Sequence, residues 1–266
     1  MYRTFDVKEF KHLSELKNEL DSLPSRYIYR GHSCHNWELE SSLERILGIN
    51  YQSKAKAYED YSLNFFERRF HLYDKSPNLP PTSKLEKLAI MQHYGFRTRM
   101  LDFTYSPYVA LYFALENIFE PPKEKFAICA IDEETILKES LRYLRKEDTS
   151  ITTEYDEITG HRNTLFKKID AMSPEILWVT EPSILNLRLE MQQGCFLFSG
   201  KPGQTIKKLF SKNIYDNIKN YFYVLPCSES KEIYYLLRKM NIDGRTIYGG
   251  LEGLAKSSYL EMHVQR

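Results

Sequence analysis

The chain has 266 residues, and 37 lysines and arginines against 36 aspartates and glutamates give it a formal net charge of +1 at pH 7. Domains that hold nucleic acid by bulk charge are usually strongly basic, so this balance argues against that class but leaves room for an enzyme with a local groove. Four scattered cysteines without a CxxC pair, and the lack of any run of roughly 18 apolar residues, predict a cytoplasmic protein with reduced thiols and no membrane span.

The N-terminal portion is predicted to be mainly helical. Residues 1–25 alternate charged and apolar side chains and are expected to form one amphipathic helix, not a signal peptide. RYIYRGHS follows and predicts a short strand that stops at Gly31. Ser41 or Ser42 can cap the next helix, which Gly48 should end. Helical spacing is found in three segments: 39–47, 51–73 and 84–94.

The second half, 121–266, is expected to be rich in strands and to end in a helix. Residues 186–199, NLRLEMQQGCFLFS, look like two short strands around a turn at Gly194. Residues 133–175 are charged and weakly patterned, which predicts short helices with a mobile connection. Buried strands are expected in three apolar runs: 125–132, 176–182 and 221–226. Helices early and strands late indicate an α+β fold with a helical N-terminal portion, not alternating βαβ units.

Arg30 and Gly31 end the first predicted strand. Arginine suits a bidentate phosphate contact, and a glycine beside it lets other atoms approach the backbone closely. The alternative is an ion pair between Arg30 and a nearby acid such as Glu38 or Glu40. From this stretch alone, that structural alternative is favoured.

A second polar group lies in residues 92–116, QHYGFRTRMLDFTYSPYVALYFALE, directly before an apolar helix that Pro107 would open. The polar residues before this helix are Arg97, Arg99, Asp102, Thr104 and Ser106. Asp102 can simply pair with one of the arginines, while Thr104 or Ser106 caps the helix. Helix N-termini also attract phosphates and carboxylates, so arginines beside one indicate an anion pocket.

The third polar group is in RLEMQQGCF. On a strand, Arg188, Glu190 and Gln192 would share one face. Such a face points either to solvent or into a pocket, and solvent is the commoner case. A site is therefore expected only if this segment meets the other two in the fold.

The polar segments resemble the FRG domain family in order and spacing. The resembling segments are YRGHSCHNWELESSLER, QHYGFRTRMLDFTYSPYVALYFA, RLEMQQGCF and NIDGRTIYGGLEGLAKSSY, which together span about residues 26–260. The family's Phe-Arg-Gly corresponds here to Tyr29-Arg30-Gly31. The tail departs from the family pattern, because Tyr248-Gly249-Gly250 stands where a Phe-Pro-Asp-like segment is expected before Leu-Glu-Gly. This departure concerns the local turn.

The three-part layout is also similar, more distantly, to that of ADP-ribosyltransferases. There an early-strand arginine anchors NAD, a Ser/Thr-bearing strand before a helix supports the nicotinamide ribose, and a late Glu or Gln completes the site. The two resemblances imply one FRG-type domain, with core motifs over 26–120 and an ADP-ribosyltransferase-like split, mainly antiparallel sheet that carries the site. In that site, Arg30 would be the anchor, Glu190 the catalytic acid and Gln192 its helper. The resemblance implies no metal, and it implies these NAD-binding residues: Arg30, Gly31, His93, Tyr94, Arg99, Asp102, Thr104 and Ser106. The chain departs in having no serine pair in the second element and a differently spaced late motif.

Three functions are compatible with these resemblances. The expected one is an NAD-dependent ADP-ribosyltransferase that modifies a macromolecule (RNA, DNA or protein), as a toxin or antiviral defence effector. The second is a non-catalytic module on the same fold that binds a phosphate or nucleotide ligand. The third is an NAD glycohydrolase, which uses the same site but transfers to water. By analogy, a toxin would be restrained by an inhibitory, antitoxin-like protein.

Overall fold

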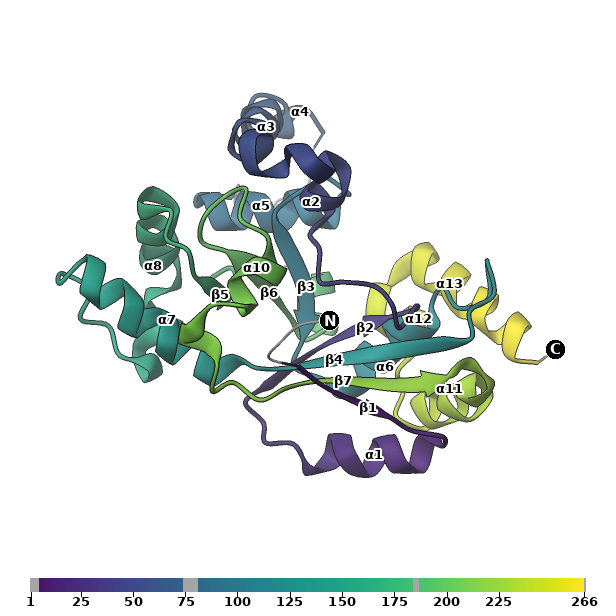
Figure 1. Ribbon diagram of the computed structural model, residues 1–266. Coiled ribbons are helices and arrows are strands. Elements are labelled where there is room, and N and C mark those ends of the chain that lie inside the picture. Colours follow the sequence, from purple (N-terminus) through teal and green to yellow (C-terminus); the bar gives the residue numbers. More distant parts are fainter. Residues whose placement is uncertain (1–4, 74–80, 184–186, 266) are drawn as a thin grey trace.

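The computed structural model describes residues 5–73, 81–183 and 187–265, which form one seven-stranded sheet with helices on both faces (Figure 1). Helix accounts for 55% and strand for 17% of the structure, which confirms the α+β class. The strands are β1 (Phe5–Glu9), β2 (Tyr27–His32), β3 (Met100–Thr104), β4 (Lys125–Asp132), β5 (Leu177–Thr180), β6 (Gly194–Ser199) and β7 (Asn220–Pro226). Their order in the sheet is β1-β7-β4-β2-β3-β6-β5.

The sheet is mainly antiparallel, as expected, and only β1 runs parallel to its neighbour β7. Its weakest junction is between β2 and β3, which share a single residue pair, Tyr29 with Thr104. By contrast, β2 pairs with β4 along its whole length. Figure 1 shows β3 turning steeply away from the direction of β2, β4 and β7. The sheet therefore consists of a four-stranded and a three-stranded part that separate beyond Tyr29.

Helices cover the two faces around separate apolar cores. One core lies between β2, β4 and β7 and the helices α1, α6, α11 and α13, and the other lies against α5, α7, α8 and α10. The helices are α1 (Leu13–Ser22), α2 (Ser42–Leu47), α3 (Tyr51–Glu67), α4 (Phe70–Tyr73), α5 (Lys84–His93), α6 (Pro107–Leu115), α7 (Glu133–Glu147), α8 (Ile158–Met172), α9 (Leu187–Met191), α10 (Ile206–Phe210), α11 (Ser230–Lys239), α12 (Gly244–Tyr248) and α13 (Gly250–Val264). The caps behave as expected at α2, where Ser41 accepts a hydrogen bond from the Glu44 amide and Gly48 ends the helix.

The prediction of one N-terminal helix over 1–25 is wrong for the described residues. Residues 1–4 lie outside them, Phe5–Glu9 form β1, and α1 begins only at Leu13. Phe5 packs against Phe210 and Phe222, with ring centroids 5.0 and 4.8 Å apart, while β1 pairs with the edge of β7. Pairing with a distant strand thus decides the structure of a segment whose local pattern favours a helix.

The second half is also more helical than its pattern indicated. Residues 133–175 form two long helices, α7 and α8, instead of short ones with a mobile connection. Asp132 caps α7 by accepting a hydrogen bond from the Thr135 amide. Of the two short strands expected over 186–199, only β6 is one; residue 186 lies outside the described part, and Leu187–Met191 form the helix α9.

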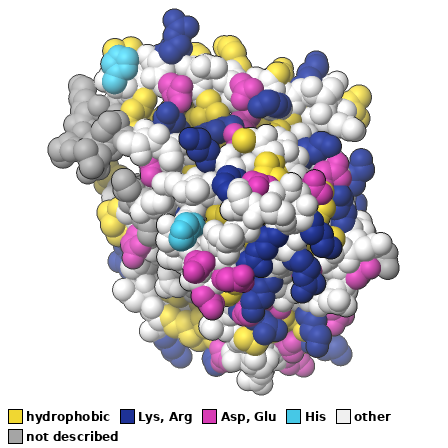
Figure 2. Space-filling view, turned by 90° about the vertical axis from the view of Figure 1, so that its left-hand side faces the viewer, with side chains coloured by type: hydrophobic (Ala, Val, Ile, Leu, Met, Phe, Trp, Pro, Cys, Tyr) yellow, Lys and Arg dark blue, Asp and Glu magenta, His cyan; other side chains and the backbone are white. Residues whose placement is uncertain are grey.

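Lys and Arg side chains are numerous on the face that holds α7 and α8, with Asp and Glu interspersed (Figure 2). On α7 the basic side chains pair with acids: Lys138 with Glu134, Arg142 with Glu139 and Arg145 with Glu154. This mixed surface agrees with the small net charge of the chain. In the described residues, no helix combines the length and the apolar character needed to cross a membrane.

Candidate functional site

A cavity of about 310 Å³ opens where β2 and β3 separate. Its walls come from β2, β3, β6, α5, α6, α9 and α12, so all the polar segments and the tail contribute. The polar lining residues are Arg30, Ser33, Gln92, His93, Asp102, Thr104, Glu116, Asn117, Arg188 and Gln192. Aromatic lining residues are Tyr29, Trp37, Phe103, Phe113, Phe196 and Tyr248. Segments far apart in sequence thus meet at one cavity of mixed charged and aromatic character.

Arg30 spans the gap between the two separating strands. Its Nη1 donates a hydrogen bond to the Asp102 carbonyl oxygen at 2.6 Å, while its buried Nε has no hydrogen-bond partner in the described part of the chain. In the same residues, no carboxylate lies within ion-pair distance of Arg30; Glu38, one of its expected partners, pairs with Lys207. Burial lowers the pKa of Arg30 from its ordinary value. A partly buried cation with unused donors therefore lies at the cavity.

Gly31 is required by helix packing. A Cβ at this position would lie 2.0 Å from the Ala110 carbonyl oxygen and 2.5 Å from the Ala114 amide nitrogen of α6. The close approach that the glycine permits is thus made by α6 on one face of β2. Gly31 also lines the cavity, so any larger residue would displace both the helix and the cavity wall.

Asp102 lies on β3 with an exposed side chain that lines the cavity. Its Oδ2 accepts a hydrogen bond from Gln92 Nε2 at 3.0 Å. Neither arginine expected as its partner pairs with it: Arg97 is exposed and Arg99 is paired elsewhere. Gln92 was not singled out in the sequence, although its place in the QHYG turn at the end of a helix could have marked it.

Thr104 and Ser106 make local contacts that shape the cavity. The Thr104 hydroxyl donates to the Gln192 carbonyl oxygen at 2.7 Å and accepts from the Ser106 amide at 3.0 Å. The Ser106 hydroxyl accepts from the Val109 amide at 3.3 Å, so it caps α6 as the local alternative predicted. Thr104 lines the cavity and ties β3 to the segment before β6, whereas Ser106 is not among the lining residues.

The late segment brings only part of its polar group to the cavity. In helix α9, residues two apart point in nearly opposite directions and residues four apart share a face. Arg188 and Gln192 therefore line the cavity together, and Glu190 is exposed outside its lining. The expectation that all three share one strand face is wrong, because the segment is helical. Gln192 is further held by a hydrogen bond from its Nε2 to the Ile247 carbonyl oxygen at 3.4 Å.

The tail supplies a wall that the sequence patterns did not assign to the site. The Tyr248 hydroxyl donates to Glu116 Oε2 at 2.9 Å, and Lys256 Nζ donates to Glu116 Oε1 at 2.8 Å. The Tyr248 ring lies between two cations, Arg188 and Lys256, each 4.3 Å from its centroid. The Gly249-Gly250 departure from the family pattern forms the turn between α12 and α13, with φ values of 69° and 53°.

His93 and Tyr94 end α5 at the rim of the cavity. His93 is a lining residue, and burial, with a smaller effect of the Arg188 charge, lowers its pKa from the ordinary value. Tyr94 packs edge-on against His93 with ring centroids 4.7 Å apart, but it is 71% exposed and outside the lining. His93 thus faces the cavity, and Tyr94 packs against its ring outside the lining.

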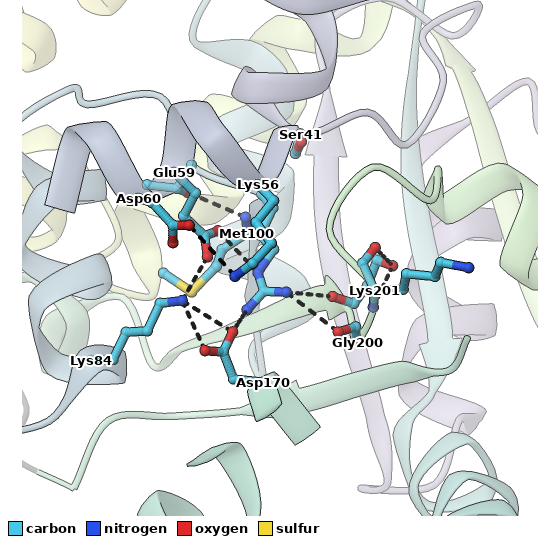
Figure 3. Close-up of polar contacts among 12 residues, drawn as sticks. Ser41, Lys56, Glu59, Asp60, Lys84, Met100, Asp170, Gly200 and Lys201 are labelled. Carbon is cyan, nitrogen blue, oxygen red and sulfur yellow. Dashed lines mark hydrogen bonds and ion pairs between the residues drawn. The ribbon is translucent and has the colours of Figure 1, made fainter. Parts of the chain in front are cut away.

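Arg99 lies away from the cavity in a buried ion network. Its side chain is fully buried, with Nε 3.0 Å from Glu59 Oε2 and Nη2 bonded to Asp170 Oδ1. Lys84 contacts the same two acids at 3.0 and 2.9 Å. Figure 3 shows Glu59, Lys84 and Asp170 converging from three helices, α3, α5 and α8. Arg99 therefore joins three helices to β3 and is not positioned at the cavity that Arg30 lines.

Comparison with known proteins gives one match. Residues 25–123 match the model of the FRG domain family, a segment that runs from just before β2 to just beyond α6. The match includes Arg30, His93, Asp102 and Thr104 and supports the resemblance to the FRG family over this segment. RLEMQQGCF and the tail lie outside it. No curated protein and no solved structure matches the chain.

Proposed function

We propose that the chain is an NAD-dependent ADP-ribosyltransferase whose NAD binds in the cavity between β2 and β3. The observation that carries the proposal is the meeting of the Arg30, Asp102–Thr104 and Gln192 segments at one cavity. These are the segments that the distant resemblance assigns to NAD, and the sheet separates where they meet.

The chemistry of the lining fits a nucleotide that carries phosphates. Arg30 provides a cation for a diphosphate and keeps donors that no group in the described residues uses. Arg188 also lines the cavity, but it pairs with Glu252 at 3.3 Å. Trp37, which is 51% exposed at the cavity, offers a surface for a planar group. The cavity volume of about 310 Å³ is at the lower end of the range of small-molecule sites.

For the acceptor we propose a macromolecule, either nucleic acid (RNA or DNA) or protein, modified in the cytoplasm. A chain of this activity would act as a toxin or antiviral defence effector and would need an inhibitory, antitoxin-like protein in its host. The mixed charge of the face in Figure 2 does not favour an acceptor held by bulk charge. An acceptor would instead be recognised near the cavity mouth.

A second candidate is the non-catalytic nucleotide-binding module. It is favoured by the position of Glu190, which is exposed outside the cavity lining, and by the neutral amide of Gln192. The late segment thus places no carboxylate at the cavity. The NAD glycohydrolase is a variant of the first candidate in which water is the acceptor.

The test is nicotinamide release from NAD by the purified chain, with and without RNA, DNA and cell lysate, beside calorimetric measurement of NAD binding. The proposal expects binding and release, both weakened strongly in Arg30→Ala and unchanged in Arg97→Ala, an exposed arginine outside the lining. Label carried from NAD into a macromolecule would name the acceptor class. Binding without release would favour the module, and folded protein that does not bind NAD would contradict the proposal.

A further inference from the structure

Two carboxylates line the cavity in the described residues, Asp102 on β3 and Glu116 at the end of α6. The two carboxylates differ in whether a cation forms an ion pair with them. Both oxygens of Glu116 already accept hydrogen bonds, one from Tyr248 and one from the Lys256 ammonium. The ion pair with Lys256, at 2.8 Å, compensates the negative charge of Glu116. Glu116 is therefore equipped to hold the cavity wall together.

Asp102 has no such ion pair in the described residues. Its single side-chain hydrogen bond comes from Gln92, a neutral donor, at 3.0 Å, and in the described residues no Lys, Arg or His nitrogen lies within 4.0 Å of its carboxylate. The hydrogen bond uses Oδ2, which leaves Oδ1 for another partner. Side chains of a strand project from the faces of the sheet, and that of Asp102 is exposed where the cavity lies beside the junction of β2 and β3.

The orientation of Gln92 is fixed by the groups around it. Thr98 Oγ1 accepts from the Met100 amide at 3.2 Å, so its proton is free to be donated to Gln92 Oε1. Gln92 Nε2 then faces two groups that can only accept, the Met100 carbonyl oxygen at 3.2 Å and the Asp102 carboxylate. The amide cannot be reversed without losing these bonds. Gln92 thus holds Asp102 Oδ2 in one direction.

Arg30 lies near this carboxylate without an ion pair to it. Its Nη1 donates to the backbone carbonyl oxygen of Asp102 at 2.6 Å and both residues line the cavity, so a cation suited to phosphate and a carboxylate without an ion pair lie near each other. From this juxtaposition we infer that Asp102 is the catalytic carboxylate and Gln92 its positioning residue, an inference that rests on the proposed function. Glu190, on the exposed side of α9, then has no part in the reaction.

The reaction step follows from the charges. The bond between ribose C1′ and the nicotinamide nitrogen breaks, and its electron pair leaves with nicotinamide, so positive charge develops on the ribose. A fixed carboxylate beside the ribose stabilises that charge as it forms. The nucleophilic atom of the acceptor then bonds to C1′, and its proton passes to solvent. No oxidant, reductant or metal is needed for this balance.

The experiment measures nicotinamide release and NAD binding for the full chain and five variants. Asp102→Asn is expected to lose release by about 100-fold or more while it binds NAD within a few-fold of wild type. Gln92→Ala should lower kcat by about fivefold, the effect of one lost hydrogen bond, with KM unchanged. Glu190→Gln tests the residue that the resemblance implies as the catalytic acid, and Glu116→Gln tests the cavity carboxylate that is paired with Lys256. Glu232→Gln, exposed on α11, is the matched control. Circular dichroism confirms that each variant is folded.

The outcomes separate the inference from the function on which it rests. Release by wild type together with undiminished release by Asp102→Asn would overturn the inference and leave the transferase intact. The same holds if Glu190→Gln or Glu116→Gln loses release and Asp102→Asn does not. Equal loss of binding and release in Asp102→Asn would make Asp102 a binding group and overturn its catalytic role. No release by folded wild-type protein under any acceptor condition would overturn both.

Discussion

Arg30 lies on β2 and Arg99 directly before the neighbouring strand β3, yet their surroundings are opposite. The Arg99 side chain is fully buried and pairs with Glu59 and Asp170. Arg30 is partly buried, with one hydrogen bond to a backbone carbonyl and an unpartnered Nε. A buried charge is tolerated only when it is compensated, so Arg99 belongs to the structure of the fold. An arginine whose donors are left over at a cavity is better suited to a ligand.

The comparison predicts that Arg99→Met has the largest effect on stability. Removing one member of a buried ion network leaves Glu59 and Asp170 with only Lys84 between them, at a cost of about 3–5 kcal/mol of unfolding free energy. The measurement is urea denaturation of the purified variant. The NAD affinity of the remaining folded protein should be unchanged, because Arg99 does not line the cavity.

The matched control is Arg97→Met, two residues earlier and exposed. It should change the unfolding free energy by less than about 0.5 kcal/mol. If Arg99→Met lowered the unfolding free energy as little as Arg97→Met, the ion network would not hold the helices together. The contrast between a structural Arg99 and a ligand-binding Arg30 would then lose its physical basis.

Arg30→Ala is expected to show the opposite pattern. Charge-assisted hydrogen bonds to phosphate contribute about 1.5–3 kcal/mol, so NAD affinity should fall by roughly 10- to 100-fold. The unfolding free energy should fall by only about 1 kcal/mol, for the lost bond to the Asp102 carbonyl oxygen. Calorimetry and urea denaturation of the same sample check both numbers. A variant that binds NAD normally but unfolds easily would make Arg30 a structural bridge between β2 and β3.

The sequence distinguished these arginines poorly, for a physical reason. Both stand near acids in the sequence, and the partners of Arg99 are 40 and 71 residues away, beyond any local pattern. For Arg30, the local alternative of a pair with Glu38 or Glu40 was favoured and is wrong in the described residues. Which arginine is compensated depends on how distant helices pack.

Local chemistry was predicted where it is decided locally. Ser41 caps α2, Pro107 opens α6 and the apolar run at 125–132 forms β4, because a capping residue, a first-turn proline and a continuous apolar run can each be recognised within the segment itself. The helix α9 escaped prediction because it has only five residues, and Leu189 packs against Gly194, where a Cβ would lie 2.4 Å from the leucine. Its turn decides that Gln192 faces the cavity and Glu190 does not. Tyr248 was missed because only the fold brings the tail to α6.

Glu133 extends the comparison to a buried acid without a cation of its own. Its neighbour Glu181 is paired with Arg162, and the Tyr105 hydroxyl lies 2.9 Å from Glu181 and 3.5 Å from Glu133. Burial, reinforced by the charge of Glu181, raises the pKa of Glu133 to about 7. The folded state therefore binds this proton more tightly than the unfolded chain does. The stability that protonated Glu133 contributes is fully present below the unfolded pKa of 4.5 and is lost as the pH rises through 7.

Glu133→Gln removes this titration, so the fall in unfolding free energy between pH 5 and pH 8 should shrink by about 2 kcal/mol. Denaturation curves across that range measure it. Glu134→Gln, one residue on and paired with Lys138 at the surface, is the control that should leave the pH profile unchanged. If Glu133→Gln leaves the pH dependence of the unfolding free energy unchanged, the charge of Glu133 is compensated in the folded chain, as that of Arg99 is.

Tyr248→Phe should have the smallest effect, and it tests whether the cavity wall depends on compensated charges. The hydroxyl contributes one hydrogen bond to Glu116, worth about 1 kcal/mol of unfolding free energy, while Lys256 still holds the other oxygen. NAD affinity should change by less than about threefold, because the ring remains between its two cations. Tyr248→Leu removes the ring as well and should weaken NAD binding further, as calorimetry on both variants would show. If Tyr248→Phe alone abolished NAD binding, the Tyr248 hydroxyl would contact the ligand directly. It would then be a binding group like Arg30 and not part of the structure of the cavity wall.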